Sequence, residues 1–336
     1  DILLEADSDI YRDGIFFVSL APLQSTEAIV SAVARALGFT FYEEEGEPRQ
    51  QQLIEYLRHK NMLLILDNFE HLLICPSDSE QDQRQPIQRD SVGLVIDTLR
   101  TAHGLRIVTT SRMRLNVPGE HLFPIAGMDL SALDTRKSSV PARFSEQTIG
   151  EPQDMAQSSA ARLFLQSARR IEPGFELTTD NSTDIVRICQ LVQGMPLGIL
   201  LAAAWTRTLT PAEIAAEIGQ SLDFLETDLH DVPARQRSMR AVFDHSWRLL
   251  SDRERAIFQT LSVFRGGFTR QAFQQVTGAS LRQIKSLVDK SLIYPAPPFS
   301  AQPKTTGRYE VHELLRKFAA EKLQTSGIAG AARDAH

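Results

Sequence analysis

The chain has 336 residues, of which 42% are hydrophobic and 23% are charged, and its net charge is −6. These proportions are those of an ordinary globular protein and exclude wholesale disorder, and the length allows two or three domains. The longest apolar stretch, from Pro196 to Trp205, is far shorter than the ~20 residues of a membrane helix. The acidic N-terminus lacks the pattern of a signal peptide, so we expect a cytoplasmic protein without a membrane partner.

Charge is distributed unevenly along the sequence. Residues 241 to 336 contain 14 lysines and arginines against 8 acids, a net charge of +6, and the rest of the chain carries −12. A basic module on an acidic body fits contact with nucleic acid. It fits docking of one domain on another equally well.

Strand-like and helix-like segments alternate over residues 1–128, which predicts an α/β fold with a parallel sheet covered by helices. One helix is capped by Ser25 or Thr26 and ended by Gly38, and a later helix covers Ser91–Thr101. The strand-like segments are Gly14–Leu20, Met62–Asp67, Leu105–Arg112 and an edge strand at His121–Ile125.

Asp67 follows the apolar run Leu63–Leu66, which is typical of a strand buried on both faces. In open parallel sheets, ligands bind beyond the carboxyl ends of the strands. A carboxylate there can hold Mg²⁺ directly or through water, and Arg112, past the end of another strand, can bind phosphate oxygens. The alternative is that Asp67 and Asn68 simply turn the chain, since both residue types are common in turns.

Past residue 128 the pattern becomes helical. Residues 129–153 are polar with scattered proline and glycine and are expected to form a linker, and residues 154–235 are expected to form a helical lid domain. Gly194 ends one helix, and Pro196 is expected in a short turn before the apolar helix Leu197–Trp205. Proline is common in the first helical turn, so Pro196 alone does not indicate a site.

Residues 236–326 have the order of a winged-helix domain, and residues 327–336 form a tail. Ser251 and Glu254 form an S-x-x-E capping box, and Thr269 caps a second helix. Ser280 opens the third helix. Two strand-like runs, Ser291–Pro295 and Arg308–Leu315, follow and are expected to pair as a hairpin.

The third helix of this domain is expected to turn apolar side chains inward and basic side chains outward. The inward residues are Leu281, Ile284, Leu287 and Val288, and the outward residues are Arg282, Lys285 and Lys290. Outward bases would suit a helix that reads DNA in the major groove. Only three bases lie on the helix and Asp289 interrupts them, which favours docking on the acidic body instead.

Several motifs resemble those of one class of proteins. "LLILDNFEHL" (63–72) looks like a Walker B segment, "RIVTTSR" (106–112) like a sensor-1 strand, and "CQLVQGMPLGILLAAAW" (189–205) like a GxP motif. "VHELLRKFAAEKL" (311–323) resembles the histidine motif near the end of the same module. In this order the motifs resemble the STAND class of P-loop NTPases, which includes the NB-ARC proteins, and most closely the ATPase modules of bacterial LuxR-type and SARP-type regulators.

The resemblance implies a P-loop NTPase core without its N-terminal part (residues 1–128), a helical lid and a winged helix. It also implies that ADP or ATP binds with Mg²⁺, which Asp67 would hold through water as the catalytic carboxylate. Arg112 would bind near the phosphates, Pro196 would pack on the adenine ring, and His312 would contact the β-phosphate of ADP. The alternative for His312 is a strand-end histidine with local hydrogen bonds.

Two departures from the family pattern bear on activity. No GxxxxGK[ST] loop occurs in the 336 residues, so either the chain starts after that loop or the module is a nucleotide-free scaffold. In both cases this chain alone should bind nucleotide poorly.

Asn68 stands where many relatives carry a second acid, and an amide cannot accept a proton at neutral pH. Glu70 is the substitute candidate, and we expect weak ATPase activity at most.

The sequence therefore predicts a nucleotide-dependent switch of a signalling or transcription-regulatory protein. Nucleotide exchange would move the winged helix off the core and expose a surface for self-association. Effector and sensor domains would lie outside this chain. The alternatives are a DNA-binding regulator acting through its winged helix and a nucleotide-free scaffold. In the switch, Asp67, Arg112, Pro196 and His312 are expected to converge on one cleft.

Overall fold

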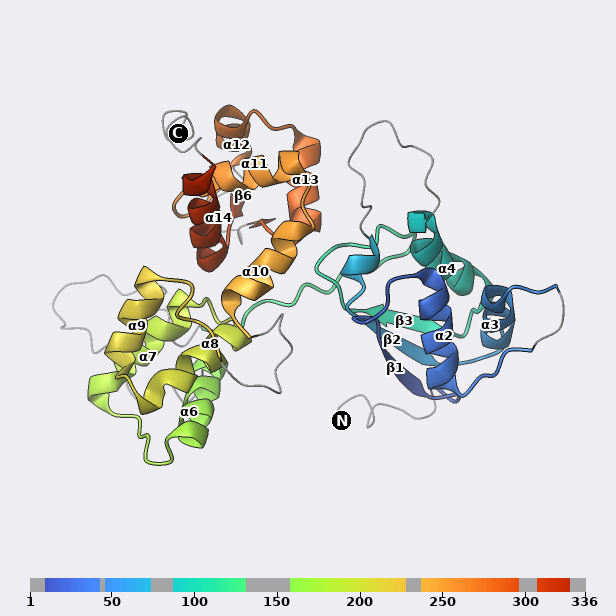
Figure 1. Ribbon diagram of the computed structural model, residues 1–336, viewed down its shortest axis with the longest axis horizontal. Coiled ribbons are helices and arrows are strands. Elements are labelled where there is room, and N and C mark those ends of the chain that lie inside the picture. The colour runs from blue at the N-terminus through green and yellow to red at the C-terminus, as the bar shows by residue number, and fades with distance from the viewer. Residues whose placement is uncertain are drawn as a thin grey trace. The chain divides into compact units, whose positions relative to one another are not determined.

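The computed structural model describes residues 10–42, 46–73, 87–130, 158–227, 237–295 and 307–326, without the side chains of residues 87–90. The chain divides into two compact units, one built on residues up to Phe123 and the other on residues from Pro124 onward. Figure 1 shows the elements of each unit. Across the described residues, no helix is both long enough and apolar enough to span a membrane.

The first unit is α/β, as the sequence predicts. Its parallel sheet has the order β1-β2-β3, and helices connect successive strands (Figure 1). The strands are β1 (Ile15–Ser19), β2 (Leu63–Asp67) and β3 (Arg106–Thr109), and the helices are α2 (Thr26–Leu37), α3 (Arg49–Leu57) and α4 (Ile87–Thr101). A 3₁₀ turn, Glu70–Leu73, follows β2.

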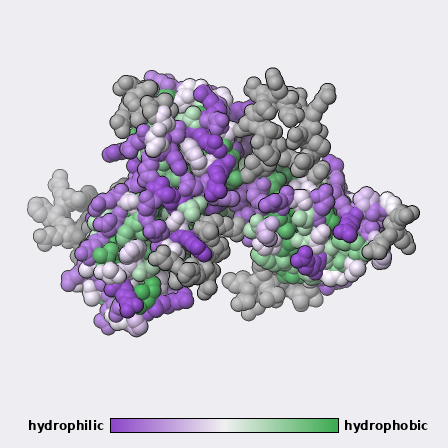
Figure 2. All heavy atoms as spheres, viewed as in Figure 1, coloured by the Kyte–Doolittle hydropathy of each residue, from purple (hydrophilic) through white to green (hydrophobic). Residues whose placement is uncertain are grey.

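The helices of this unit pack on one face of the sheet. Side chains of Val18, Leu64 and Leu66 enter the core with those of α2, α3 and α4. On the other face, Phe17 and Val108 are 61% and 49% exposed. Because the strand order advances in one direction, right-handed crossovers put every connection on the same side. Figure 2 shows apolar residues, in green, among the polar residues of the surface.

The local signals for the first helix are confirmed. The Ser25 side chain accepts a hydrogen bond from the Ala28 amide at 3.2 Å, and Gly38 adopts the left-handed conformation at φ 67°. The predicted edge strand at His121–Ile125 is wrong. That segment has no partner strand among the described residues, Pro124 offers no amide donor, and Phe123 is 90% exposed.

The second unit begins with helices around one core. They are α6 (Ser159–Ile171), α7 (Thr179–Leu191), α8 (Pro196–Ala203) and α9 (Pro211–Gln220), with a 3₁₀ turn at Ala204–Arg207. Pro196 is the first residue of α8 rather than part of a preceding turn. Its fixed φ and missing amide suit that position, where the amide would have no helical partner.

The rest of the second unit combines helices with a small antiparallel sheet of order β4-β6-β5. The helices are α10 (Met239–Arg248), α11 (Asp252–Leu261), α12 (Arg270–Thr277), α13 (Leu281–Asp289) and α14 (Glu313–Thr325). The strands are β4 (Phe268–Thr269), β5 (Tyr294–Pro295) and β6 (Arg308–Glu310). The capping box of Ser251 and Glu254 and the cap of α12 by Thr269 are confirmed.

Two expectations for this region need correction. The strand-like run Arg308–Leu315 is a strand only as far as Glu310, because His312 caps α14 and the helix begins at Glu313. On α13, Ile284 and Leu287 are buried as expected, but Leu281 is 47% exposed. Leu281 lies at the helix start, where no preceding turn helps to cover it.

Helices α10 and α14 join the two parts of the second unit. Met239 and Phe243 of α10 and Leu314 and Phe318 of α14 are buried in the core of α6–α9. Polar contacts add to this packing, because Lys317 Nζ donates to the Ile218 and Gly219 carbonyls at the end of α9. Such a lysine also complements the negative end of the helix dipole.

Candidate functional site

Asp67 lies at the carboxyl edge of the parallel sheet. It is the last residue of β2, and its Oδ1 accepts a hydrogen bond of 2.6 Å from the Thr110 hydroxyl, just past β3. The backbone amide of Asn68 donates to the same hydroxyl oxygen at 2.9 Å. The carboxylate is therefore held in place by its neighbouring strand at the edge where open parallel sheets bind ligands.

Asn68 adopts the left-handed conformation, with φ 68°. This conformation is uncommon for residues other than glycine, although asparagine tolerates it better than most. Asn68 Nδ2 lies 3.1 Å from His71 Nδ1, and His71 Nε2 lies 2.7 Å from the Leu23 carbonyl oxygen. A continuous set of hydrogen bonds thus connects the end of β2 to the loop between β1 and α2.

Glu70 and Arg112 lie together at the same edge. The Glu70 carboxyl is almost fully buried, and its Oε1 is 3.8 Å from Arg112 Nε. Because the Glu70 side chain is almost fully buried, its carboxylate has little access to water. The geometry gives Glu70 the role of holding Arg112 near the strand ends.

His312 lies where the helical part of the second unit meets α14. Its Nδ1 accepts a hydrogen bond from the Leu314 amide at 3.2 Å, so it caps the helix. The neighbouring Glu313 amide donates to Gln193 Oε1, which belongs to the turn before α8. His312 and the turn of Gln193 and Gly194 before α8 are therefore adjacent within this unit.

The electrostatic surroundings of His312 keep its ring neutral. Burial lowers its pKa to about 4, against the opposing effects of the Val192 carbonyl and the Glu313 carboxylate. Since Nδ1 accepts a hydrogen bond, the proton of the neutral ring is on Nε2. Within the described part of the chain, this buried Nε2 has no partner that meets hydrogen-bond geometry.

The turn before α8 is held by close backbone contacts. Gly194 has φ 69°, and its carbonyl oxygen accepts a hydrogen bond of 2.7 Å from the Met128 amide. A side chain on Gly194 would collide with the Met128 backbone, and one on Gly127 would collide with the Gln193 carbonyl. Both glycines are required for this approach, which fixes the turn beside His312.

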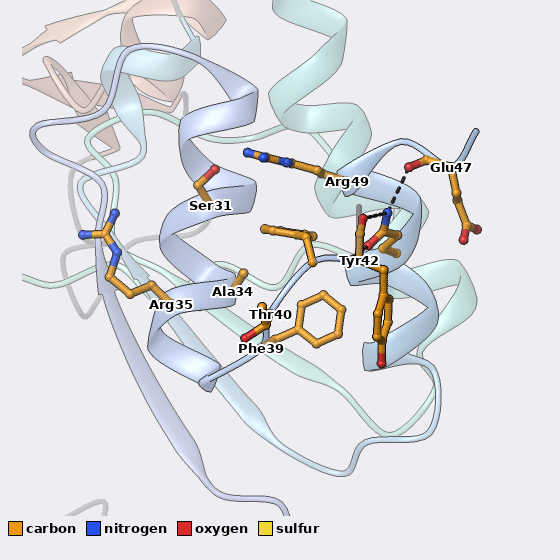
Figure 3. Close-up of a pocket in the computed structure, with 10 residues that line it drawn as sticks. Ser31, Ala34, Arg35, Phe39, Thr40, Tyr42, Glu47 and Arg49 are labelled. Carbon is orange, nitrogen blue, oxygen red and sulfur yellow. Dashed lines mark hydrogen bonds between the residues drawn. The ribbon is translucent and has the colours of Figure 1, made fainter. Parts of the chain in front are cut away.

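The described residues line cavities of different sizes. One of about 150 Å³ is lined by Gln193, the Gly266–Gly267 loop, Glu313 and Arg316, close to His312. The other, of about 570 Å³, lies between α2 and α3 and is shown in Figure 3. Its labelled lining includes Ser31, Tyr42 and Arg49, but none of the site residues predicted from the sequence.

A magnesium nucleotide fits the residues at the sheet edge in part. No cluster of three or more metal-binding side chains occurs in the described ranges. Mg²⁺ commonly uses one or two carboxylates together with phosphates and waters, so Asp67 suffices as the protein ligand. The 336 residues contain no phosphate-binding loop motif.

The structure places the predicted residues in two groups. Asp67, Glu70 and Arg112 lie at the sheet edge of the first unit. Pro196 and His312 lie in the second unit, where the amide next to His312 donates to Gln193 in the turn before Pro196. Convergence of the two groups stays a prediction. Sequence reasoning did not identify Thr110, His71 or Gln193, whose roles depend on partners between 3 and 120 positions away.

Comparison with known proteins gives relatives but no match to a family model. A Mycobacterium tuberculosis protein named as a candidate HTH-type transcriptional regulator is 30% identical over 331 residues, which cover 96% of this chain and 32% of the relative. An uncharacterised protein of the same organism is 28% identical over 324 residues, covering 93% of this chain and 69% of its own length. The chain thus spans about a third of the length of the first relative.

Solved structures with similarity include a STAND protein with a tetratricopeptide repeat sensor from Pyrococcus horikoshii. It has 14% identity and a TM-score of 0.25, over 92% of this chain and 40% of that protein. The ORC2 protein of Aeropyrum pernix, solved as ADPNP–ADP complexes, has 12% identity and a TM-score of 0.41, over 96% of this chain and 81% of that protein.

Proposed function

We propose that this chain is the nucleotide-sensing part of a regulatory switch. ADP or ATP with Mg²⁺ binds at the carboxyl edge of the sheet, with Asp67 as the metal carboxylate and Arg112 near the phosphates. In the resting state, Pro196 packs on the adenine ring and His312 donates to the β-phosphate of ADP. Hydrolysis is slow, and the bound nucleotide sets the arrangement of the two units.

The observation that carries this proposal is the buried His312 Nε2–H. The Val192 carbonyl acts on this ring without meeting hydrogen-bond geometry, and a buried donor left unsatisfied costs about 1–3 kcal/mol, so such a group calls for an explanation. A phosphate oxygen is a strong acceptor and would satisfy it. Because the ring is neutral at pH 7, His312 would bind the phosphate by hydrogen bonding rather than as a cation.

The open face of the sheet supports a further element in the complete protein. Parallel sheets are normally covered on both faces, yet Phe17 and Val108 are exposed here. Suppose that a further strand lies beside β3 and that its connection runs back across the sheet to β1. This connection runs in the opposite direction to the others, so a right-handed crossover would place its helix on the open face. Such a reversal would also make the Asp67 edge a topological switch point. The occupant that we propose is the segment bearing the phosphate-binding loop, within the longer protein indicated by the relatives.

Calorimetry with ADP and Mg²⁺ tests the proposal. This chain alone should give no measurable binding heat, whereas the chain joined to its phosphate-binding loop should bind ADP. In the joined protein, Asp67→Asn should weaken the Mg²⁺-dependent affinity by about tenfold or more, because it removes the anionic metal ligand. Asp97→Asn, at an exposed position on α4, is the matched control. Phosphate release at several turnovers per second would contradict the slow-hydrolysis assignment.

DNA binding by α13 is the second candidate function. Arg282 and Lys285 are exposed on this helix, in the basic last quarter of the chain. We expect weak, sequence-independent binding with a dissociation constant of about 10⁻⁴ to 10⁻⁶ M. The logarithm of the affinity should fall by about 0.9 per phosphate neutralised for each tenfold rise in salt concentration. A mobility-shift titration with random and genomic duplexes decides, and a nanomolar, sequence-selective band would favour the DNA reader. Replacing both bases by glutamine should then flatten the salt slope by roughly two units.

A further inference from the structure

The larger cavity of the first unit lies apart from the candidate nucleotide site. It has a volume of about 570 Å³ and is bounded by α2, α3 and the segment that joins them (Figure 3). Phe39 of that segment packs on Tyr56 of α3, with ring centroids 4.6 Å apart. Lys60 lies over the same tyrosine ring and pairs with Asp13, which precedes β1. The aromatic floor of the cavity therefore lies toward the amino ends of the strands, opposite the edge that carries Asp67.

Aromatic rings form much of the cavity wall. Phe39 meets Phe41 edge to face at a centroid distance of 5.3 Å, and it meets Tyr42 in the same way at 6.4 Å. Edge-to-face packing of this kind is a favourable arrangement of aromatic rings. Tyr42 is 70% exposed, so part of the aromatic surface is open to a ligand. The wall suits a ligand with a flat apolar part.

The Gln52 side chain fixes the rim of the cavity. Gln52 is buried, and its Oε1 accepts a hydrogen bond of 2.9 Å from the Tyr42 amide. Its Nε2 donates to the carbonyl oxygens of Tyr42 and Glu47 at 3.3 and 3.0 Å. One buried amide thus ties together two points of the segment between α2 and α3. The rim is held by the chain's own hydrogen bonds, as in the largely pre-formed sites that bind small molecules.

Arg49 is the charged side chain that extends across the cavity. Figure 3 shows it running from α3 toward Ser31 of α2. In the same view, Arg35 and the carboxylate of Glu47 point away from the cavity. The Arg49 guanidinium lies over the Phe41 ring, 5.4 Å from its centroid, and in the described ranges it has no carboxylate at ion-pair distance. A guanidinium presents a planar fork of donors that matches a carboxylate.

We propose that this cavity is a binding site for a small aromatic carboxylate. The flat part of the ligand packs on the aromatic wall, and its carboxylate pairs with Arg49 in the space that the Ser31 hydroxyl also lines. An anion is favoured over a cation, because Arg49 crosses the cavity whereas the Glu47 carboxylate points away from it. The site goes beyond the proposed function, since it uses no residue of the Asp67 edge and gives the first unit a separate chemical input.

An amide NMR titration of this chain with 2-naphthoate tests the proposal without nucleotide. The amide signals of Ser31, Thr40 and Tyr42 should shift and saturate, with a dissociation constant of about 1 mM or below for a ligand of this size. 2-Naphthamide has the same rings without the charge and should bind about tenfold more weakly or worse, because it forms no charge-assisted pair. Shifts that do not saturate, or equal affinity for the two probes, would overturn the proposal.

Two arginine variants give a matched comparison. Arg49→Gln should weaken the binding of 2-naphthoate by about tenfold or more, because it removes the charged partner of the carboxylate. Arg35→Gln removes the same charge from a side chain that points away from the cavity, so the affinity should stay within about twofold. Equal losses in the two variants would show a general attraction to positive charge and would count against a site at Arg49.

The acids that follow Tyr42 in the sequence supply a further control. Glu43, Glu44 and Glu45 lie outside the described residues. Replacing all three by glutamine should change the affinity for 2-naphthoate by no more than about threefold, the size of a general effect of surface charge. An affinity that rises by about tenfold or more in this variant would show that the chain's own acids compete for Arg49, and would overturn the ligand site.

Discussion

The sheet edge at Asp67 and the junction at His312 differ in how far their surroundings are packed. At the sheet edge, polar side chains are half-buried and hydrogen-bonded to one another, and the sheet behind them is covered on one face only. At the junction, His312 is half-buried beside a packed core, and its buried Nε2 has no partner that meets hydrogen-bond geometry among the described residues. The second unit therefore encloses its core between helices, whereas the first unit leaves one face of its sheet exposed beside the Asp67 edge.

The packing difference predicts the largest effect. Phe318→Ala should lower the free energy of unfolding of the second unit by about 3–5 kcal/mol, because it opens a cavity where α14 enters the core. Phe17→Ala, on the open face of the sheet, should cost the first unit far less, since that ring is 61% exposed. Urea denaturation followed by unit-specific hydrogen exchange measures both, and equal losses would contradict the account.

The close approach at Gly194 predicts the next largest effect. Gly194→Ala should destabilise the second unit by about 2–3 kcal/mol, because it combines a strained positive φ with a collision against the Met128 backbone. Gly219→Ala is the control, because this glycine of α9 has no neighbouring atom within 4 Å of the added methyl group. Alanine there should stabilise by up to about 1 kcal/mol. Thermal unfolding of the pair gives the comparison.

The neutral His312 ring predicts a loss of stability in acid. Its folded-state pKa of about 4 lies below the ordinary value of 6.5, so the unfolded chain binds the proton first as the pH falls. The stability contributed by the neutral ring is present above about pH 6.5 and is lost progressively toward pH 4, with about 2 kcal/mol gone at pH 5. His312→Gln should lack this part of the pH dependence, which unfolding curves at pH 7.5 and 5 would show.

The polar contacts between α10 and its neighbours predict the smallest effect. Arg240 pairs with Asp223 and with Glu321, linking α10 to the segment after α9 and to α14. Since these groups are partly exposed, Arg240→Met should cost no more than about 1 kcal/mol. A loss as large as that of Phe318→Ala would show that ion pairs, rather than apolar packing, join the two parts of the unit.

The sequence predicts most of the fold where its signals are local. The strands β1, β2 and β3 follow from short apolar runs, and Ser25, Gly38 and Thr269 cap helices as their residue types imply. Helix α3 was not predicted, because Pro48 precedes it without a side-chain cap and its apolar residues are few. The error at His121–Ile125 shows that an apolar run also needs a partner edge.

Of the candidate site, only the residues that stand in recognisable motifs could be predicted from the sequence. Asp67, Arg112 and His312 stand out because of where their motifs fall. Their partners do not, because His71 acts through the Leu23 carbonyl, 48 positions away. The Gly194 turn depends likewise on a backbone contact with Met128 that no side-chain pattern records.

Nucleotide-dependent closure of the two units is the central claim, and one distance measurement tests it most directly. Spin labels at His59→Cys on the first unit and Gln274→Cys on the second, both exposed, report the separation of the units in the loop-joined protein with Cys75→Ser. Cys189 is buried and burial raises its thiol pKa to about 12, so it should resist labelling. The account predicts that ADP with Mg²⁺ narrows a broad distance distribution to a single peak and that His312→Gln broadens it again. A distribution unchanged by saturating ADP would contradict it.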